Sequence, residues 1–275
     1  MGVLKDLTKE YFGEKVRKED DINIEGLDVK IGSFTDNNGK FHKKGYKPKN
    51  SPTLKKLLKR MIEVRGDEGD FNDIDTSDIK SMEALFMRNK TFNGNISGWN
   101  VSKVETMKYM FNDATSFNQP IGGWEFPNVL NMSHMFDGAI SFNQDISNWK
   151  FPKVSTLSFM FKGATKFNQP IGDWEFPKVK NICAMFWVAT SFNQDISNWK
   201  FPQVKFMSYM FEGATSFNQP IGDWEFPNVE YMSNMFKDAT SFNQDLSKWN
   251  LSNVNNKENI FENCPIQDEF KPKMK

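Results

Sequence analysis

Aromatic and aliphatic residues recur along most of this chain at a constant spacing of 25. The spacing is clearest at tryptophan, which holds one position in seven successive units: Trp99, Trp124, Trp149, Trp174, Trp199, Trp224 and Trp249. A fixed period of this length is typical of stacked supersecondary units, because one unit cannot bury its apolar face alone and each neighbour completes the next. The pattern therefore predicts a repeat solenoid.

Each unit combines two shorter patterns. At 124–126 two rings flank a glutamate, which is the alternation of a short strand with one buried face, and Pro127 marks the end of that strand. Apolar residues then follow at helical spacing, at Val129, Met132, Met135 and Phe136. We expect one short parallel strand and a short helix or helical turn in each coil.

One polar column runs through the apolar series. It consists of Asn93, Asn118, Asn143, Asn168, Asn193, Asn218 and Asn243. A buried amide needs partners, so we expect each side chain to bond backbone groups of its own or the next coil as a structural ladder. Because the residue recurs in every coil, a catalytic role is not favoured. A second column alternates in charge (Glu125, Lys150, Glu175, Lys200 and Glu225) and predicts ion pairing that fixes the register.

The sequence before the repeats predicts a cap. Apolar residues at helical spacing in 2–18 predict an amphipathic helix that packs on the body or a partner, or less favourably lies on a membrane surface. The stretch 27–46 alternates around TDNNGK, a turn signal, and predicts a hairpin. Ser51 as N-cap and Pro52 as first helical residue predict a second helix.

Three regions follow from these patterns. Residues 1–66 form the N-terminal helix, hairpin and capping helix, residues 67–262 form the repeats with degenerate first and last coils, and residues 263–275 form a tail. A cap is expected because the first coil would otherwise expose an apolar face and an unpaired edge.

Charge is unevenly placed although the net charge is zero. Residues 1–66 carry a net charge of +6 and the rest −6, and lysines gather in 40–60. That basic stretch could bind nucleic acid or another acidic polymer, although a solvated face is the commoner meaning of a charge run.

Cys183 and Cys264 are more than three coils apart, too far for a disulfide. The N-terminal stretch lacks the apolar core of a secretory signal, and no segment is long enough for a membrane helix.

Motifs for chemistry are missing. His42 and His134, the two histidines, lie in different regions, and the sequence has no GxGxxG, GxxxxGK or CxxC motif. We expect no enzyme, no cofactor and no metal site.

The units FNQPIGDWEFPNVEYMSNMF and FNQDISNWKFPQVKFMSYMF resemble the repeat of the BspA-like bacterial leucine-rich-repeat surface proteins, FNQDIS-x-W-x-V-S-x-V-x-x-M-x-x-MF. The resemblance covers roughly residues 40 to 262, with FP in place of VS after the tryptophan in five coils. It implies a leucine-rich-repeat-like solenoid used for adhesion, protein binding or host contact. It also implies a surface location, whereas the chain as given carries no leader and would be cytoplasmic.

Function is expected where the repeat is broken. Aromatic rings stand at positions that are polar in other coils, and exposed rings anchor interfaces. The candidate partner-binding residues are Trp187, Phe159, Phe206, Tyr209, Tyr109 and Tyr231. We expect a non-catalytic scaffold for protein–protein interaction or adhesion. The alternatives are acidic-polymer or nucleic-acid binding through 40–60, and a purely structural, self-assembling solenoid.

Overall fold

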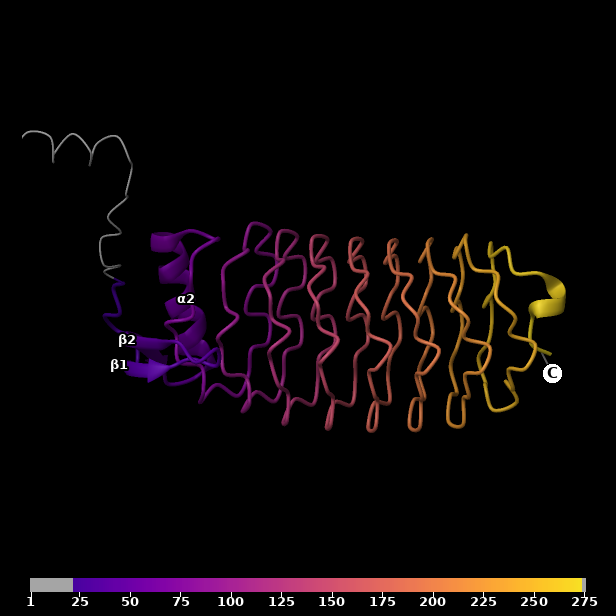
Figure 1. Ribbon diagram of the computed structural model, residues 1–275, viewed down its shortest axis with the longest axis horizontal. Helices are drawn as coiled ribbons and strands as arrows, with labels where there is room; N and C mark the ends of the chain where they lie inside the picture. The colour runs from indigo at the N-terminus through magenta and orange to yellow at the C-terminus, as the bar shows by residue number, and fades with distance from the viewer. Residues whose placement is uncertain (1–21, 274–275) are drawn as a thin grey trace, which may run out of the picture.

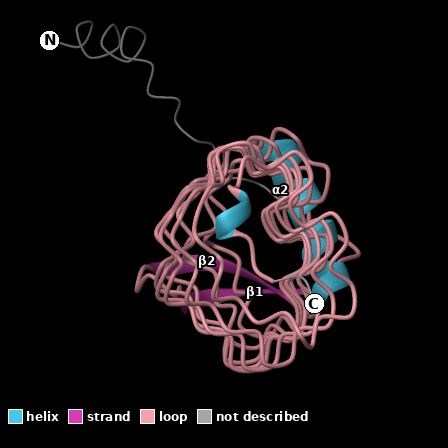
Figure 2. Cartoon of the chain, turned by 90° about the vertical axis from the view of Figure 1, so that its right-hand side faces the viewer, coloured by secondary structure: helices cyan, strands magenta, loops and turns pink. Residues whose placement is uncertain are grey.

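The computed structural model describes residues 22–273, so the helix expected at 2–18 lies outside the described residues. The named elements are β1 (Val29–Thr35), β2 (Phe41–Pro48), α2 (Ser51–Arg65) and the short 3-10 helix η1 (Asp268–Phe270). Between α2 and η1 the chain forms successive coils that lie side by side along the long axis (Figure 1). Seen from the end, the coils follow one closed outline, and α2 lies along one side of it (Figure 2).

The cap confirms the predicted hairpin and second helix. Strands β1 and β2 pair antiparallel, and the turn between them places Gly39 at a φ of 81°, a value that favours glycine. The predicted helix start is wrong by one residue. Asn50 is the N-cap of α2, and its side chain accepts a hydrogen bond from the Thr53 backbone N–H at 3.0 Å. Asparagine caps as well as serine does, and Ser51 becomes the first helical residue.

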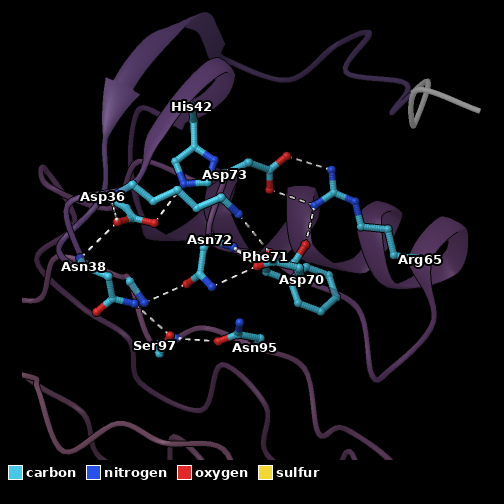
Figure 3. Close-up of polar contacts among 12 residues, drawn as sticks. Asp36, Asn38, His42, Arg65, Asp70, Phe71, Asn72, Asp73, Asn95 and Ser97 are labelled. Atoms are coloured by element: carbon cyan, nitrogen blue, oxygen red, sulfur yellow. Dashed lines mark hydrogen bonds and ion pairs between the residues drawn. The ribbon is translucent and has the colours of Figure 1, made fainter. Parts of the chain in front are cut away.

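Backbone hydrogen bonds join the cap to the first coil. The Tyr46 N–H donates to the Asp73 carbonyl at 2.8 Å, and the Asp75 N–H donates back to the Tyr46 carbonyl at 2.9 Å. The Arg65 guanidinium forms two 2.7 Å bonds with the Asp73 carboxylate (Figure 3). Strand β2 thus pairs with the exposed edge of the stack, as a cap must.

The hairpin turn, which is held by a buried carboxylate, bonds to the second coil. Asp36 contacts the His42 ring at 2.8 Å, and its other oxygen accepts the Asn38 and Lys40 N–H groups (Figure 3). Burial opposes ionisation of Asp36, but these hydrogen bonds outweigh it and lower the pKa of the carboxyl below its usual range. The Asn37 N–H then donates to the Gly98 carbonyl of the second coil.

The repeating coils differ locally from the prediction. In the described residues no strand occurs at 124–126 or its equivalents, and no helix follows it. Instead, one residue per coil forms an isolated parallel bridge with its equivalent in the next coil, from Ser81 through Thr106 and Asn131 to Asn256. Consecutive turns replace the predicted helix, and only the helical-turn alternative survives. The coil is held mainly by its neighbours and not by internal strands or helices.

Stacked rings fill the interior. The Trp149, Trp174, Trp199 and Trp224 indoles lie 6.4 Å apart in nearly parallel planes. Each of these indole N–H groups donates to the carbonyl of an isoleucine in the preceding coil, as Trp174 does to Ile146 at 3.1 Å. The phenylalanines form parallel columns of their own beside the tryptophans. The repeat period is therefore the period of ring-on-ring packing.

The asparagine ladder is confirmed. Each Oδ1 accepts the backbone N–H of the next asparagine in the column at 2.9 Å, from Asn93 through Asn243. The prediction of a buried column is wrong. The asparagines are partly exposed, and Asn143 is exposed. In four coils a glutamine strengthens the ladder by donating to the asparagine before it, for example Gln219 to Asn193 at 2.9 Å.

Asn193→Ala should reduce the free energy of unfolding by about 1–2 kcal/mol, because the Asn218 N–H loses its acceptor and the Gln219 amide loses one of its two acceptors. Thermal denaturation measures the change. Asn198→Ala, at an exposed asparagine outside the column, is the matched control and should cost less than about 0.5 kcal/mol. Equal losses for the two variants would contradict the ladder's role.

The predicted acid–base column is not observed as ion pairs. In the described part of the chain, no ion pair joins Glu125, Lys150, Glu175, Lys200 and Glu225 to one another. Pairs between coils lie elsewhere, such as Lys205 with Glu230 at 2.8 Å. Register is therefore set by the rings and the asparagines.

The C-terminal tail covers the last coil. The Leu246 N–H donates to the Phe270 carbonyl at 2.8 Å, and the Gln267 N–H continues the asparagine ladder at Asn243. Cys183 and Cys264 are free thiols, as predicted. Within residues 22–273 no helix has the length and apolar character needed to cross a bilayer.

Candidate interaction surface

One side of the stack is built from the turn segments that bond directly to the next coil. We call it the ladder face, after these backbone hydrogen bonds and not after the asparagine ladder, which lies elsewhere on the coil. The ladder face consists of residues 106–113, 131–138, 156–163, 181–188, 206–213 and 231–238. Every second N–H of a segment donates to the next coil. In the first segment Met107, Tyr109, Phe111 and Asp113 donate to carbonyls of the following segment, at 2.7–3.1 Å. The intervening N–H groups close turns within the coil, so the backbone of this face is fixed in both directions.

Left-handed backbone positions allow this arrangement. Tyr109, His134, Phe159, Ala184 and Tyr209 occupy equivalent places with φ between 54° and 62°. Such angles are uncommon for residues other than glycine, and here they turn alternate N–H groups out of the coil toward the neighbour. A helix directs every N–H along its own axis, which explains why the predicted helix does not form.

Four of the six predicted interface residues belong to one continuous ring stack. Tyr109 lies 4.6 Å from His134, His134 lies 4.5 Å from Phe159, Phe159 lies 6.4 Å from Trp187, and Trp187 lies 6.0 Å from Tyr209, between ring centroids. The sequence prediction omitted His134 from this set, although it stands in the same column. Four coil spacings of about 4.8 Å make the stack about 19 Å long.

Trp187 enters the stack from a neighbouring column. The coil that carries Trp187 has Ala184 where the other four coils of the stack have a ring, and Ala184 is fully buried. The indole contacts Phe159 and Tyr209 across that coil, so it fills the place that the small alanine leaves. Trp187 is only partly exposed, which corrects the prediction of a freely exposed ring. The Lys162 ammonium lies 5.0 Å from its centre, within cation–π range.

Val188 marks the same coil as unusual. Its φ is 56°, and a β-branched residue at such an angle is a genuine outlier, whereas glycine stands at the equivalent positions 138, 163 and 213. Its side chain is 41% exposed. An apolar residue is therefore kept on the surface against both conformational and solvation preference.

The remaining two predicted residues form a separate pair on the same face. Phe206 and Tyr231 stack at 5.3 Å, and they are 37% and 39% exposed. Tyr209, one turn from Phe206 in the same coil, is 40% exposed. The ladder face thus brings together all six predicted residues, in two stacks instead of one patch.

A carboxyl group belongs to this surface. Glu212 occupies the position of Trp187 one coil later, and its Oε2 atom is buried with no hydrogen-bond partner in the described structure. Burial raises the pKa of Glu212, nearby Asp238 and Glu262 raise it further, and Lys237 opposes the shift. An acceptor of this kind is costly to leave unpaired, and the side chain as a whole is only partly buried.

Some lysines of the basic stretch 40–60 form ion pairs within the protein. Lys47 bridges Asp75 and Asp78 at 3.1 and 2.9 Å, and Lys49 pairs with Asp28 at 2.7 Å. Lys103 and Lys47 together lower the pKa of Asp78 to about 2. Lys47 therefore joins the cap to the first coil, whereas Lys49 pairs within the cap.

Groups able to perform chemistry are scattered. His42 bonds Asp36 in the cap, while His134 bonds Asp137 at 2.8 Å on the ladder face. Burial raises the pKa of the Cys183 thiol to about 11, which keeps it protonated at neutral pH. Residues 22–273 contain no cluster of three or more histidine, cysteine or acidic side chains placed to hold a metal ion.

Comparison with known proteins identifies a family. The family described as "Mycoplasma protein of unknown function, DUF285" matches residues 54–174 and 155–272. These two adjacent matches together cover most of α2, the coils and the tail, and they identify a repeat protein. No curated protein and no solved structure matches the chain.

Proposed function

The chain belongs to the DUF285 family, whose function is unknown, and we propose that it is a non-catalytic protein-interaction scaffold that binds its partner through the ladder face. The observation that carries the proposal is the Tyr109–Tyr209 ring stack, because it is the place where the repeat is broken in favour of large apolar side chains. Exposed aromatic residues on a rigid backbone are the usual anchors of protein interfaces.

The architecture also favours the finer fold assignment. A stack of 25-residue coils with one parallel bridge per coil resembles a leucine-rich-repeat solenoid of the BspA-like type, and we propose that class. By that analogy adhesion and a surface location are candidate roles. In repeat scaffolds, stability and binding depend on different positions, since inward residues hold the stack together and outward residues are free to vary.

Two details support binding at this place over a purely structural reading. Val188 keeps an exposed apolar side chain at a strained angle, which a structural role alone does not require, and Glu212 leaves a buried oxygen unpaired. Lys162 beside Trp187 adds a positive charge at the edge of the rings. A protein partner with apolar and mixed polar groups matches this composition.

Trp187→Ala should weaken partner binding by about 2 kcal/mol or more, as for a central interface ring. The test is quantitative recovery of bound proteins from the native cells, with wild-type and variant chains as bait. Lys200→Glu is the control, because position 200 is half a coil away from 187. The same proteins recovered equally by all three chains would contradict the proposal.

A further inference from the structure

In the column that contains Trp187, residues at equal distances before and after Trp187 carry opposite charges. Equivalent residues of successive coils in this column are Asp137, Lys162, Trp187, Glu212 and Lys237. One coil before Trp187 stands a lysine and one coil after it a glutamate. Two coils before stands an aspartate and two coils after it a lysine. The column is therefore complementary to its own reversed copy.

A twofold axis gives that complementarity a geometric meaning. Two ladder faces can meet about a twofold axis that passes through the Trp187 coil, parallel to the chain segments of the face and perpendicular to the long axis of the stack. Each column then faces itself, and the order of coils is reversed. Lys162 then lies opposite Glu212 of the second copy, and Asp137 lies opposite Lys237 of the second copy. Such an isologous interface uses one surface patch twice, which is the commonest arrangement in homo-oligomers.

The same operation matches the apolar groups. Trp187 and Val188 each face their own equivalents at the axis, and Phe159 faces Tyr209 of the second copy. Rings would thus be covered at the centre with charge pairs beside them, as in a stable interface. The coils form a nearly straight stack, so two faces can remain in contact over several coils (Figure 1).

The charged groups of the column have neighbours within the chain, so self-pairing would exchange those contacts. The Lys162 ammonium lies 3.7 Å from Asp137 and over the Trp187 ring, and Lys237 pairs with Glu262 at 2.8 Å. Glu212 Oε2 has no hydrogen-bond partner in the described structure, and the Glu212 side chain is only partly buried, so Lys162 of a second copy would approach its carboxyl group.

From these observations, and resting on the proposed function of the ladder face, we propose that its partner is a second copy of this chain, packed antiparallel about a twofold axis at the Trp187 coil. The alternative occupant, a different protein, requires no symmetry about Trp187. Reversing the charge at position 162 or at position 212 distinguishes the two occupants. Only in a self-paired dimer does position 162 of one copy lie opposite position 212 of the other.

The experiment is sedimentation of the full chain and of two single variants, Lys162→Glu and Glu212→Lys. The full chain should form a dimer. Each variant alone places like charges opposite each other at both pairs, so its dimer should dissociate at least about tenfold more readily. Mixing the two variants in equal amounts should restore the dimer, since every 162–212 pair is then opposite in charge.

Two further chains keep the result interpretable. A chain with both substitutions should dimerise with itself, which shows that the fold accepts both replacements, and Lys200→Glu should behave as the wild type. A wild type that stays monomeric at all concentrations, or a mixture no tighter than the singles, would overturn self-pairing. If the chain is monomeric while Trp187→Ala still loses a different protein, self-pairing fails and the proposed function stands.

Discussion

Trp174→Ala should lower the free energy of unfolding by about 3–5 kcal/mol, the usual cost of truncating a core aromatic residue. The indole lies between Trp149 and Trp199 at 6.4 Å from each and packs edge-on against Phe151 at 4.8 Å. Its loss would leave a cavity and remove the hydrogen bond to the Ile146 carbonyl. Urea denaturation followed by circular dichroism measures the change.

Trp187→Ala is the control for that experiment, because it makes the same chemical change on the surface of the stack. It should cost under about 1.5 kcal/mol, since the half-buried indole packs against Phe159, Tyr209 and Lys162 at the edge of the stack and not between two other indoles. Equal losses for Trp174→Ala and Trp187→Ala would show that the ladder-face ring is a core residue.

Removal of residues 1–66 should convert the chain into larger assemblies or aggregate. The deletion uncovers the first coil, where α2 buries Leu54, Leu57, Leu58 and Met61 and where Tyr46 of β2 pairs with the edge at Ile74. Each buried aliphatic side chain contributes about 1.5–3 kcal/mol, and an uncovered edge invites pairing with another chain. Light scattering after size-exclusion chromatography measures the mass.

The matched control removes residues 1–21 alone, which retains the hairpin and α2. That chain should keep the oligomeric state of the full-length protein. A fragment 67–275 that has the same oligomeric state as the full chain and remains soluble would refute the capping role.

The sequence predicted the stack of coils, the cap and the asparagine ladder, because each depends on a pattern that repeats or on a local signal. Tryptophan at a constant spacing requires equivalent coils whatever their internal geometry. The turn at Gly39 and the helix after Asn50 follow from residue preferences that act within a few positions.

The backbone of each coil could not be predicted in the same way. Met132, Met135 and Phe136 have helical spacing, but the left-handed angle at His134 turns alternate N–H groups toward the next coil. No residue preference predicts this left-handed angle, since tyrosine, histidine, phenylalanine and alanine all adopt it here. Hydrogen bonding between coils overrides the local preference for helix.

The candidate surface was predicted in composition but not in arrangement. The sequence shows that Trp187 replaces polar residues, yet only the structure shows it filling the gap above Ala184. The separation of Phe206 and Tyr231 from the longer stack also depends on where each column lies around the coil. Equivalent positions in successive coils are neighbours by period alone, whereas neighbours in different columns require coordinates.

The most direct test of the ladder face as the binding surface is photo-crosslinking in the native cells. A photoreactive phenylalanine derivative would replace Phe159, Trp187 or Tyr209 on the ladder face, and Glu175, Lys200 or Glu225 half a coil away. We expect crosslinked products from the first three positions and none from the second three. Products from the second set alone would contradict binding through the ladder face.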